Sequence, residues 1–142
     1  MTLIVDAGPL VAAAISTDRH NRACKALLAR GVGPLLVPQL VVAEVAYLLA
    51  DRLGPAAETA FVAAIAAGEL EVEPVAADEW ARVHELVKRY EDLPLGVTDA
   101  SVVVLAERLG HTTVASLDHR HLAVVQPAHV ERLSLVPQLG DT

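Results

Sequence analysis

Four carboxylates are the side chains of this 142-residue chain best suited to chemistry: Asp6, Glu44, Asp99 and Asp118. Carboxylate oxygens are the ligands that Mg²⁺ and Mn²⁺ prefer in proteins, whereas zinc and copper sites draw on thiolates and clustered imidazoles. Cys24 is the only cysteine, which excludes an internal disulfide and a cysteine-based zinc site. A hard divalent cation is therefore the cofactor that this set of residues would take.

Two of these acids follow predicted strands. Residues 3–5 form a short apolar run that ends at Asp6, and residues 112–116 form another that leads to Asp118. In parallel α/β sheets ligands collect beyond the carboxyl ends of the strands, so both acids are placed to meet a ligand. Turn chemistry is the alternative for each, because Asp is common where a strand gives way to a loop.

The other two acids lie in predicted helices. Asp99 follows Thr98, which we expect to cap a helix that runs to Gly110, and the helix dipole favours an ionised carboxylate in that first turn. Acids are also enriched there for stability alone. Glu44 has apolar neighbours one turn away on both sides, so its charge would need a partner on a buried face. The alternative is a solvated stripe shared with Asp51.

Basic residues and histidines offer candidate contacts to phosphate. The densest basic patch lies in a predicted helix over residues 18–30, and Gly31 stands where a C-terminal cap belongs. His119 and His121 flank Arg120 directly after Asp118. Alternating residues share a face only in an extended segment, so we interpret these histidines as polar loop residues rather than as zinc ligands or a catalytic base.

Helices and strands alternate along the part of the chain that must position these side chains. Besides residues 18–30, helices are expected directly after Pro9 and over residues 38–54, 55–68, 78–90 and 98–110. Strands are expected over residues 3–5, 70–74 and 112–116, with residues 133–136 as a candidate last strand. This alternation predicts a layered α/β domain with a mainly parallel sheet.

Composition and charge narrow the function classes. The length suits one ordinary domain, so we expect a single domain over residues 1–142, with a core of Ala, Val, Leu and Ile because 54% of residues are hydrophobic but only 3% aromatic. The net charge of −7 argues against a generic nucleic-acid-binding surface. Carboxylates gathered around divalent cations would account for part of that charge.

The N-terminal part of the sequence argues against a membrane-spanning segment and a secretory signal. The longest uncharged stretch runs from Gly31 to Ala43 and contains Pro34 and Pro38, which makes it too short and too broken to cross a bilayer. No basic region precedes the first apolar run, and Asp6 interrupts that run. We therefore expect the protein to be cytoplasmic.

Four segments carry a resemblance to a known family. They are Leu-Ile-Val-Asp ending at Asp6, Val-Val-Ala-Glu-Val around Glu44, Thr-Asp-Ala-Ser-Val-Val-Val-Leu-Ala-Glu-Arg-Leu-Gly from Thr98, and Val-Ala-Ser-Leu-Asp ending at Asp118. With their order and spacing, the chain resembles the PIN-domain family and, within it, the VapC-type toxin ribonucleases of bacterial type II toxin-antitoxin systems. Two positions depart from the family pattern. Ala7 stands where a hydroxyl residue is common, and Leu122 stands near a common aromatic position.

The resemblance implies a fold, an activity and partners. The fold would be a three-layer α/β/α domain, and Asp6, Glu44, Asp99 and Asp118 would be the catalytic residues and the ligands of Mg²⁺ or Mn²⁺, with Asp6 and Asp99 as principal ligands. The activity would be endonucleolytic cleavage of structured RNA, either transfer RNA or ribosomal RNA, by metal-activated water. The partners would be the RNA substrate, a cognate antitoxin protein and a second copy of the chain in a homodimer.

Two other function classes compete with this interpretation. A receiver-like signalling domain also has acids at strand ends, but it needs paired acids after its first strand and a lysine late in the sheet, and the only lysines here are Lys25 and Lys88. A noncatalytic PIN-like protein-interaction module is the second alternative. Such modules typically lose acids, whereas all four are present in this chain.

Overall fold

Five parallel strands form the central sheet of the computed structural model, which describes residues 2–30 and 33–140. The strands are arranged in the order β3-β2-β1-β4-β5, and each pairs in parallel with its neighbour. Their bounds are β1 (Ile4–Val5), β2 (Leu35–Pro38), β3 (Leu70–Glu73), β4 (Thr113–Ala115) and β5 (Ser134–Val136).

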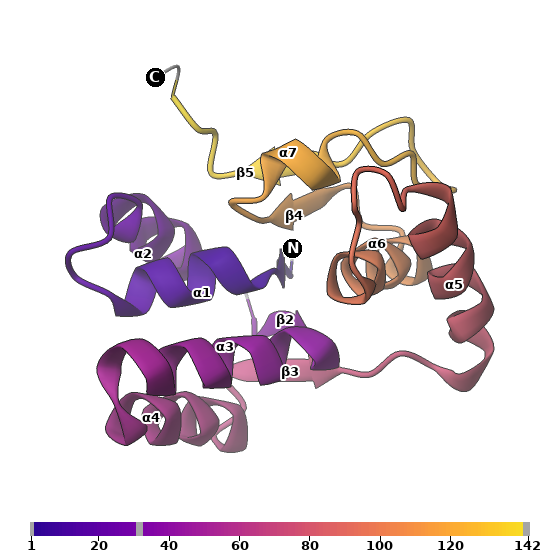
Figure 1. Ribbon diagram of the computed structural model, residues 1–142. Helices are drawn as coiled ribbons and strands as arrows, with labels where there is room; N and C mark the ends of the chain where they lie inside the picture. Colours follow the sequence, from indigo (N-terminus) through magenta and orange to yellow (C-terminus); the bar gives the residue numbers. More distant parts are fainter. Residues whose placement is uncertain (1, 31–32, 141–142) are drawn as a thin grey trace.

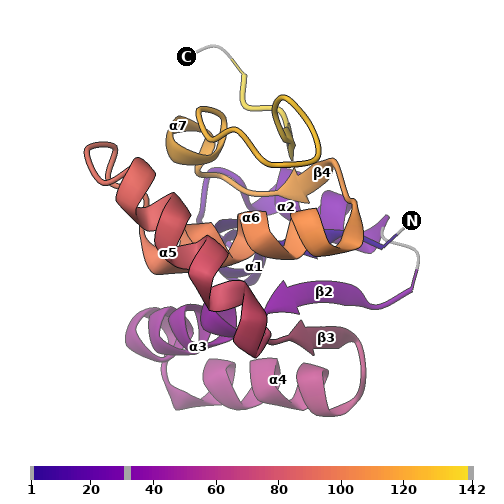
Figure 2. The same ribbon diagram turned by 90° about the vertical axis from the view of Figure 1, so that its right-hand side faces the viewer.

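Helices cover both faces of this sheet (Figure 1). On one side lie α1 (Ala7–Ala14), α2 (Asn21–Ala29), α3 (Gln39–Leu53) and α4 (Pro55–Ala66), and on the other lie α5 (Trp80–Arg89) and α6 (Val97–Leu109). The view turned by 90° shows α5 and α6 in front of the sheet and α1 behind it (Figure 2). A short 3₁₀ helix (Ala77–Glu79) precedes α5, and the one-turn helix α7 (His119–Leu122) links β4 to the last strand. The predicted three-layer α/β/α fold is confirmed.

Small apolar side chains fill the space between the layers. Ile4 and Val5 of β1 are fully buried, and every residue of α6 from Ala100 to Ala106 is buried as well. A helix that is apolar on all sides must lie inside the molecule, which places α6 between the sheet and the amphipathic helix α5. Buried aliphatic side chains rather than aromatic rings thus supply most of the hydrophobic stabilisation, as the composition predicts.

The chain reverses its direction of travel across the sheet between β1 and β4. It steps outward from β1 to β2 and β3, and then returns through α5 and α6 to β4 on the other side of β1. The carboxyl ends of β1 and β4 therefore adjoin at a switch point, where open α/β sheets bind ligands. Gly8 of α1 lies close to Leu117, which follows β4, because glycine has no side chain. A Cβ at position 8 would lie 3.0 Å from Cβ of Leu117.

Several boundaries differ from the sequence predictions. Strand β2 was not predicted, because Leu35 to Val37 are a short run between two prolines, and only pairing with β1 and β3 makes them a strand. Gly96, not Thr98, is the N-cap residue of α6. The second helix begins at Asn21 rather than at residue 18, since the Asp18 carboxylate accepts a bond from the His20 backbone in a turn. The Gly31 cap lies outside the described residues.

Candidate active site

An open cavity of about 700 Å³ lies where α3 and α6 meet the end of β4. Three of the predicted site residues, Glu44, Asp99 and Asp118, line it. The other residues of the lining carry no charge and come from α3 and the start of α6. They are Leu40, Ala43, Tyr47, Gly96, Val97 and Thr98. Among the described residues of this lining there is no lysine or arginine.

Asp6 lies at the floor of the site, directly after β1. Its side chain is almost fully buried, with 5% of the residue exposed. One carboxylate oxygen accepts a bond of 2.8 Å from the backbone N–H of Ala7, and the other accepts one of 2.8 Å from Oγ of Ser116. Burial raises the pKa of Asp6, the two hydrogen bonds lower it, and the charge of Asp118 raises it further. The ionised form of Asp6 is therefore costly unless a cation binds nearby.

Ser116 contacts two of the acids and was not singled out by the sequence analysis. It is fully buried at the end of β4, where its hydroxyl donates to Asp6 and accepts a 3.0 Å bond from the backbone N–H of Asp118. One hydroxyl thus joins the ends of the two central strands. Ala7 has no hydroxyl to offer Asp6, and the hydroxyl of Ser116 makes such a contact instead. In the sequence, Ser116 could have been noticed as the serine of the segment Val-Ala-Ser-Leu-Asp.

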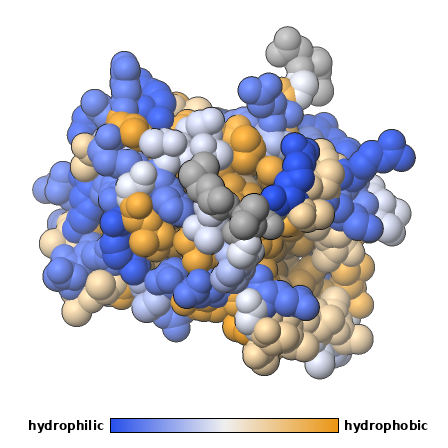
Figure 3. Space-filling view, turned by 180° about the vertical axis from the view of Figure 1, so that it is seen from behind, coloured by the Kyte–Doolittle hydropathy of each residue, from blue (hydrophilic) through white to orange (hydrophobic). Residues whose placement is uncertain are grey.

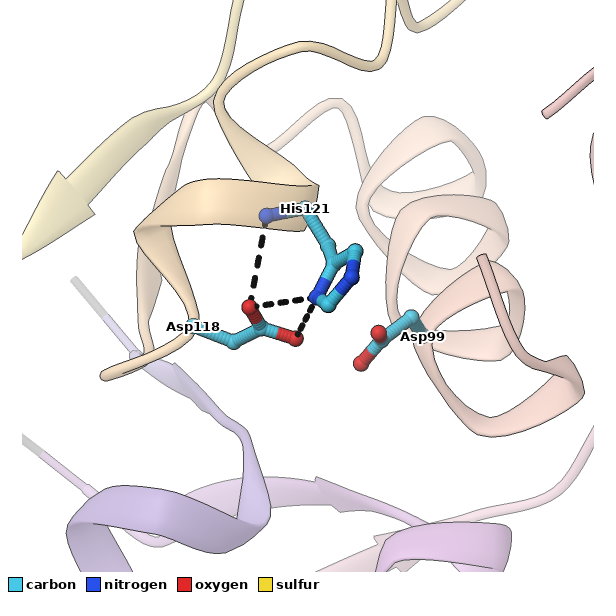
Figure 4. Close-up of side chains that lie close together, drawn as sticks. All are labelled: Asp99, Asp118 and His121. Carbon is cyan, nitrogen blue, oxygen red and sulfur yellow. Dashed lines mark hydrogen bonds and ion pairs between the residues drawn. The ribbon is translucent and has the colours of Figure 1, made fainter. Parts of the chain in front are cut away.

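Asp99 projects from the first turn of α6 toward Asp118 (Figure 4). Burial is the largest cause that raises the pKa of Asp99 to about 7. The charges of Asp6 and Asp118 and a hydrogen bond with Asp118 raise it further, while the charge of His121 opposes them. Asp99 therefore gains and loses its proton near neutral pH, and a cation bound beside it would favour the ionised form.

Asp118 and His121 face each other across the single turn of α7 (Figure 4). Nδ1 of His121 lies 2.8 and 2.9 Å from the two carboxylate oxygens of Asp118, and the backbone N–H of His121 donates to one of them over 3.3 Å. Ligand atoms of Asp99, Asp118 and His121 all lie within 4.8 Å of one another. The interpretation of His121 as a loop residue is wrong, because it belongs to α7, whose single turn brings the imidazole back to Asp118.

Glu44 lies on α3 at the mouth of the cavity. It is exposed, so the argument that its face is buried and demands a partner is wrong. Partial burial is nevertheless the first cause that raises the pKa of Glu44, followed by the charges of Asp6 and Asp118. The structure therefore places Glu44 within the field of the other acids but on a solvated surface.

The basic patch predicted to contact phosphate lies elsewhere. Arg22, Lys25 and Arg30 are exposed on or directly after α2, which packs against α1, and none of them lines the cavity. Glu44, Asp99 and Asp118 line the cavity, and the charge of the buried Asp6 acts on Glu44 and Asp99. A donor set rich in carboxylate oxygens fits a hard divalent cation. The chemical fit between these residues and a metal ion is therefore good.

Comparisons with known proteins find similarity over most of the chain. The family model for the PIN domain matches residues 3–126. Ribonuclease VapC26 of Mycobacterium tuberculosis is 32% identical over 135 residues, which are 95% of this chain and 100% of that protein.

Two solved structures share the fold. The sarcin-ricin loop cleaving toxin VapC20 of Mycobacterium tuberculosis superposes with a TM-score of 0.76 at 22% identity, over 83% of this chain and 91% of that one. VapBC2 from Rickettsia felis, bound to a DNA fragment from its promoter, gives a TM-score of 0.61 at 15% identity, over 95% of this chain and 97% of that one.

Proposed function

Because the chain belongs to the PIN domain family and, within it, to the VapC ribonucleases, we propose that it is a metal-dependent endoribonuclease toxin that cuts RNA at the cavity beside β1 and β4. The observation that carries this proposal is the convergence of Asp6, Glu44, Asp99 and Asp118, from four separate segments, on one place in the fold. Closely spaced carboxylates repel one another, and a divalent cation relieves that repulsion.

Each acid has a distinct part in this proposal. Asp99 and Asp118, whose ligand atoms lie within 4.8 Å of each other, would hold the cation, either Mg²⁺ or Mn²⁺, in place of the predicted principal pair Asp6 and Asp99. The buried Asp6 would complete the site. Glu44 stands at the solvated mouth, where it contributes directly or through water. The cation would activate a water molecule for attack and would neutralise charge on the scissile phosphate and the leaving oxygen. Ser116 and the Ala7 backbone keep Asp6 oriented.

The mechanism fixes the chemistry of the product ends. The oxygen of water attacks phosphorus in line, the bond from phosphorus to the 3′ oxygen breaks, and that oxygen takes a proton. The products carry a 5′-phosphate and a 3′-hydroxyl. A 2′,3′-cyclic phosphate would instead require attack by the RNA 2′-hydroxyl and would contradict this proposal.

An antitoxin and a second copy of the chain are the protein partners that we propose. Figure 3 shows a pale-orange surface over α4 at the lower right, where exposed small apolar residues gather. They are Ala56, Ala60, Val62, Ala63 and Ala66. Exposed apolar surface of this kind marks an interface. A basic side chain of an antitoxin placed among the carboxylates would block both cation and RNA.

The proposed function also bears on where the protein acts in the cell and on which residues form the domain. None of the helices in residues 2–30 and 33–140 has the length and apolar character needed to cross a bilayer. A substrate among cellular RNAs supports the cytoplasm as the place of action. We also infer that residues 1–142 act as one domain, since the sheet recruits strands from both ends of the chain.

Cleavage of structured RNA by the purified protein is the experiment that tests the proposal. Transfer RNA and ribosomal RNA are incubated with Mg²⁺, Mn²⁺ or EDTA, and the ends of the products are mapped. We expect discrete cuts that need the cation and that disappear in Asp99→Asn. The control is Asp92→Asn, because Asp92 is an exposed acid outside the cavity. Cutting by Asp99→Asn at the wild-type rate would remove Asp99 from the site. Folded wild-type protein that cuts neither RNA would favour the noncatalytic module.

A further inference from the structure

Among the described residues, His121 is the histidine whose ring lies in the cluster with Asp99 and Asp118. Its ring contacts both oxygens of Asp118, and its ligand atom lies within 4.8 Å of those of Asp99 and Asp118. Bonds of about 2.0–2.2 Å to a common ion separate neighbouring ligand atoms by about 3 Å and opposite ones by about 4.4 Å. The three residues are therefore spaced as ligands of one cation would be.

We propose that His121 is a ligand of the catalytic cation, together with Asp99 and Asp118, and that its imidazole gives the site a preference for Mn²⁺ over Mg²⁺. This inference rests on the proposed function, because it concerns the metal of the same site. Mg²⁺ is bound almost entirely by oxygen, whereas imidazole nitrogen strengthens the binding of transition metals. A set of two carboxylates and one imidazole should therefore show a larger difference in affinity between Mn²⁺ and Mg²⁺ than a set of four carboxylates would.

The local fold favours this role for His121. Asp118 is the N-cap of α7, and the single turn of this helix brings residue 121 back beside it. The ring is partly buried, with 25% of the side chain exposed, so its position is defined while one edge remains open. Nδ1 of His121 lies 2.8 Å from Oδ1 of Asp118, and this contact holds the ring beside the two carboxylates.

His119 provides a matched comparison two residues away. Its Nε2 lies 2.9 Å from the carbonyl oxygen of Ser116, and the metal-ligand cluster in the described residues does not include it. The two histidines have the same chemistry and belong to the same turn of helix. Any difference between their variants therefore reports the position of the ring rather than the presence of a histidine.

Pulsed electron paramagnetic resonance of Mn²⁺ bound to the tag-free protein tests the proposal directly. A histidine ligand gives a ¹⁴N modulation of the Mn²⁺ echo, which oxygen ligands do not. We expect this modulation in the wild type and in His119→Phe, and its loss in His121→Phe. Isothermal titration should show that His121→Phe weakens Mn²⁺ binding by at least about tenfold and changes Mg²⁺ binding much less. Circular dichroism checks that each variant is folded.

Two outcomes would overturn the proposal, and they have different meanings. Mn²⁺ that binds to the wild type, is lost in Asp99→Asn and shows no ¹⁴N modulation would exclude His121 as a ligand but leave the metal-dependent nuclease intact. Wild-type protein that binds no Mn²⁺ would overturn both the ligand and the metal-dependent mechanism. The wild-type spectrum decides the first point even if His121→Phe fails to fold.

Discussion

The pKa of Asp99 links the stability of the protein to pH. Burial and the adjacent acids raise its pKa from 3.8 to about 7, so the folded protein binds this proton more tightly than the unfolded chain does. The resulting cost in stability is absent below the unfolded pKa of 3.8, grows as the pH rises from there, and is complete above the folded pKa of about 7. Protonation or a bound cation each relieve it.

The variant Asp99→Asn should therefore be more stable than the wild type in EDTA at pH 8. After allowance for solvent screening, we expect a gain on the order of 1 kcal/mol. This corresponds to a rise in Tm of about 4 °C for a domain of this size. Thermal unfolding followed by circular dichroism at pH 5 and pH 8 measures it, and the gain should shrink at pH 5. A gain of equal size at both pH values would show that the carboxylate charge is not its cause.

Glu44 is predicted to matter for catalysis rather than for folding. It is exposed and lies near Asp6 and Asp118, so Glu44→Gln removes a negative charge from the site and disturbs no packing. We expect a loss of about 10- to 100-fold in RNA cleavage with no change in Tm. Asp51→Asn, an exposed acid two turns along the same helix, is the control and should cleave normally. Equal losses in the two variants would indicate a general effect of charge.

Asp6 and Asp118 could be predicted as neighbours from residue types and strand ends alone, whereas Glu44 and Asp99 were assigned to the site through the family resemblance. Asp6 and Asp118 stand directly beyond apolar runs, so the pattern alone places them at one edge of a parallel sheet. The contacts of His121 and Ser116 with the acids were not predicted, because they depend on how the chain turns after β4. Alternation of residues describes an extended segment, whereas α7 is a helical turn that brings positions 118 and 121 together.

At the scale of the elements, the junction between β1 and β4 positions the buried half of the site. The hydroxyl of Ser116 spans the junction by donating to Asp6 while it accepts from the backbone of Asp118. The backbone N–H of Asp6 also donates to the carbonyl oxygen of Ala115, over 2.8 Å. Gly8 lets α1 begin against Leu117. These contacts fix two acids that are 112 positions apart in sequence.

Loss of that bridge should reduce both stability and activity. In Ser116→Ala the Asp118 N–H and one Asp6 oxygen lose their partner, which should cost about 1–3 kcal/mol in the free energy of unfolding. We expect cleavage to fall at least about tenfold, as for the loss of other groups that orient metal ligands. Urea unfolding and cleavage rates are measured beside Ser134→Ala, an exposed serine of β5. Full activity in Ser116→Ala would show that Asp6 is oriented without it.

Helices were easier to predict than strands in this chain because their ends carry chemical signals. Gly54, Pro55 and Gly110 mark helix boundaries in the sequence, and the structure places helix ends beside them. Strand β2 carries no such signal, since its four residues are recognisable only through their neighbours in the sheet. Short buried strands depend on tertiary pairing, which a local pattern does not contain.

At the scale of the whole molecule, the net charge of −7 should repel RNA, which is also negatively charged. Arg82 pairs with Glu85 and Glu107, and Arg108 pairs with Glu73 and Glu79, so these arginines stabilise the fold rather than bind RNA. The acidic cavity itself would repel phosphate until a cation binds. RNA binding at the site should therefore depend on a divalent cation.

We accordingly predict that bulk transfer RNA binds the wild-type protein at least about tenfold more tightly in Ca²⁺ than in EDTA at constant ionic strength, a difference of about 1.4 kcal/mol. Ca²⁺ takes the same oxygen ligands as Mg²⁺, so it reports binding through the carboxylates. Fluorescence anisotropy of labelled RNA measures the affinity, and Asp99→Asn should lose the gain. A protein carrying Arg22→Ala and Lys25→Ala tests the exposed basic patch on α2. If affinity is the same in Ca²⁺ and EDTA but falls in that double variant, α2 rather than the acidic cavity holds the RNA, and the cation acts only in the cleavage step.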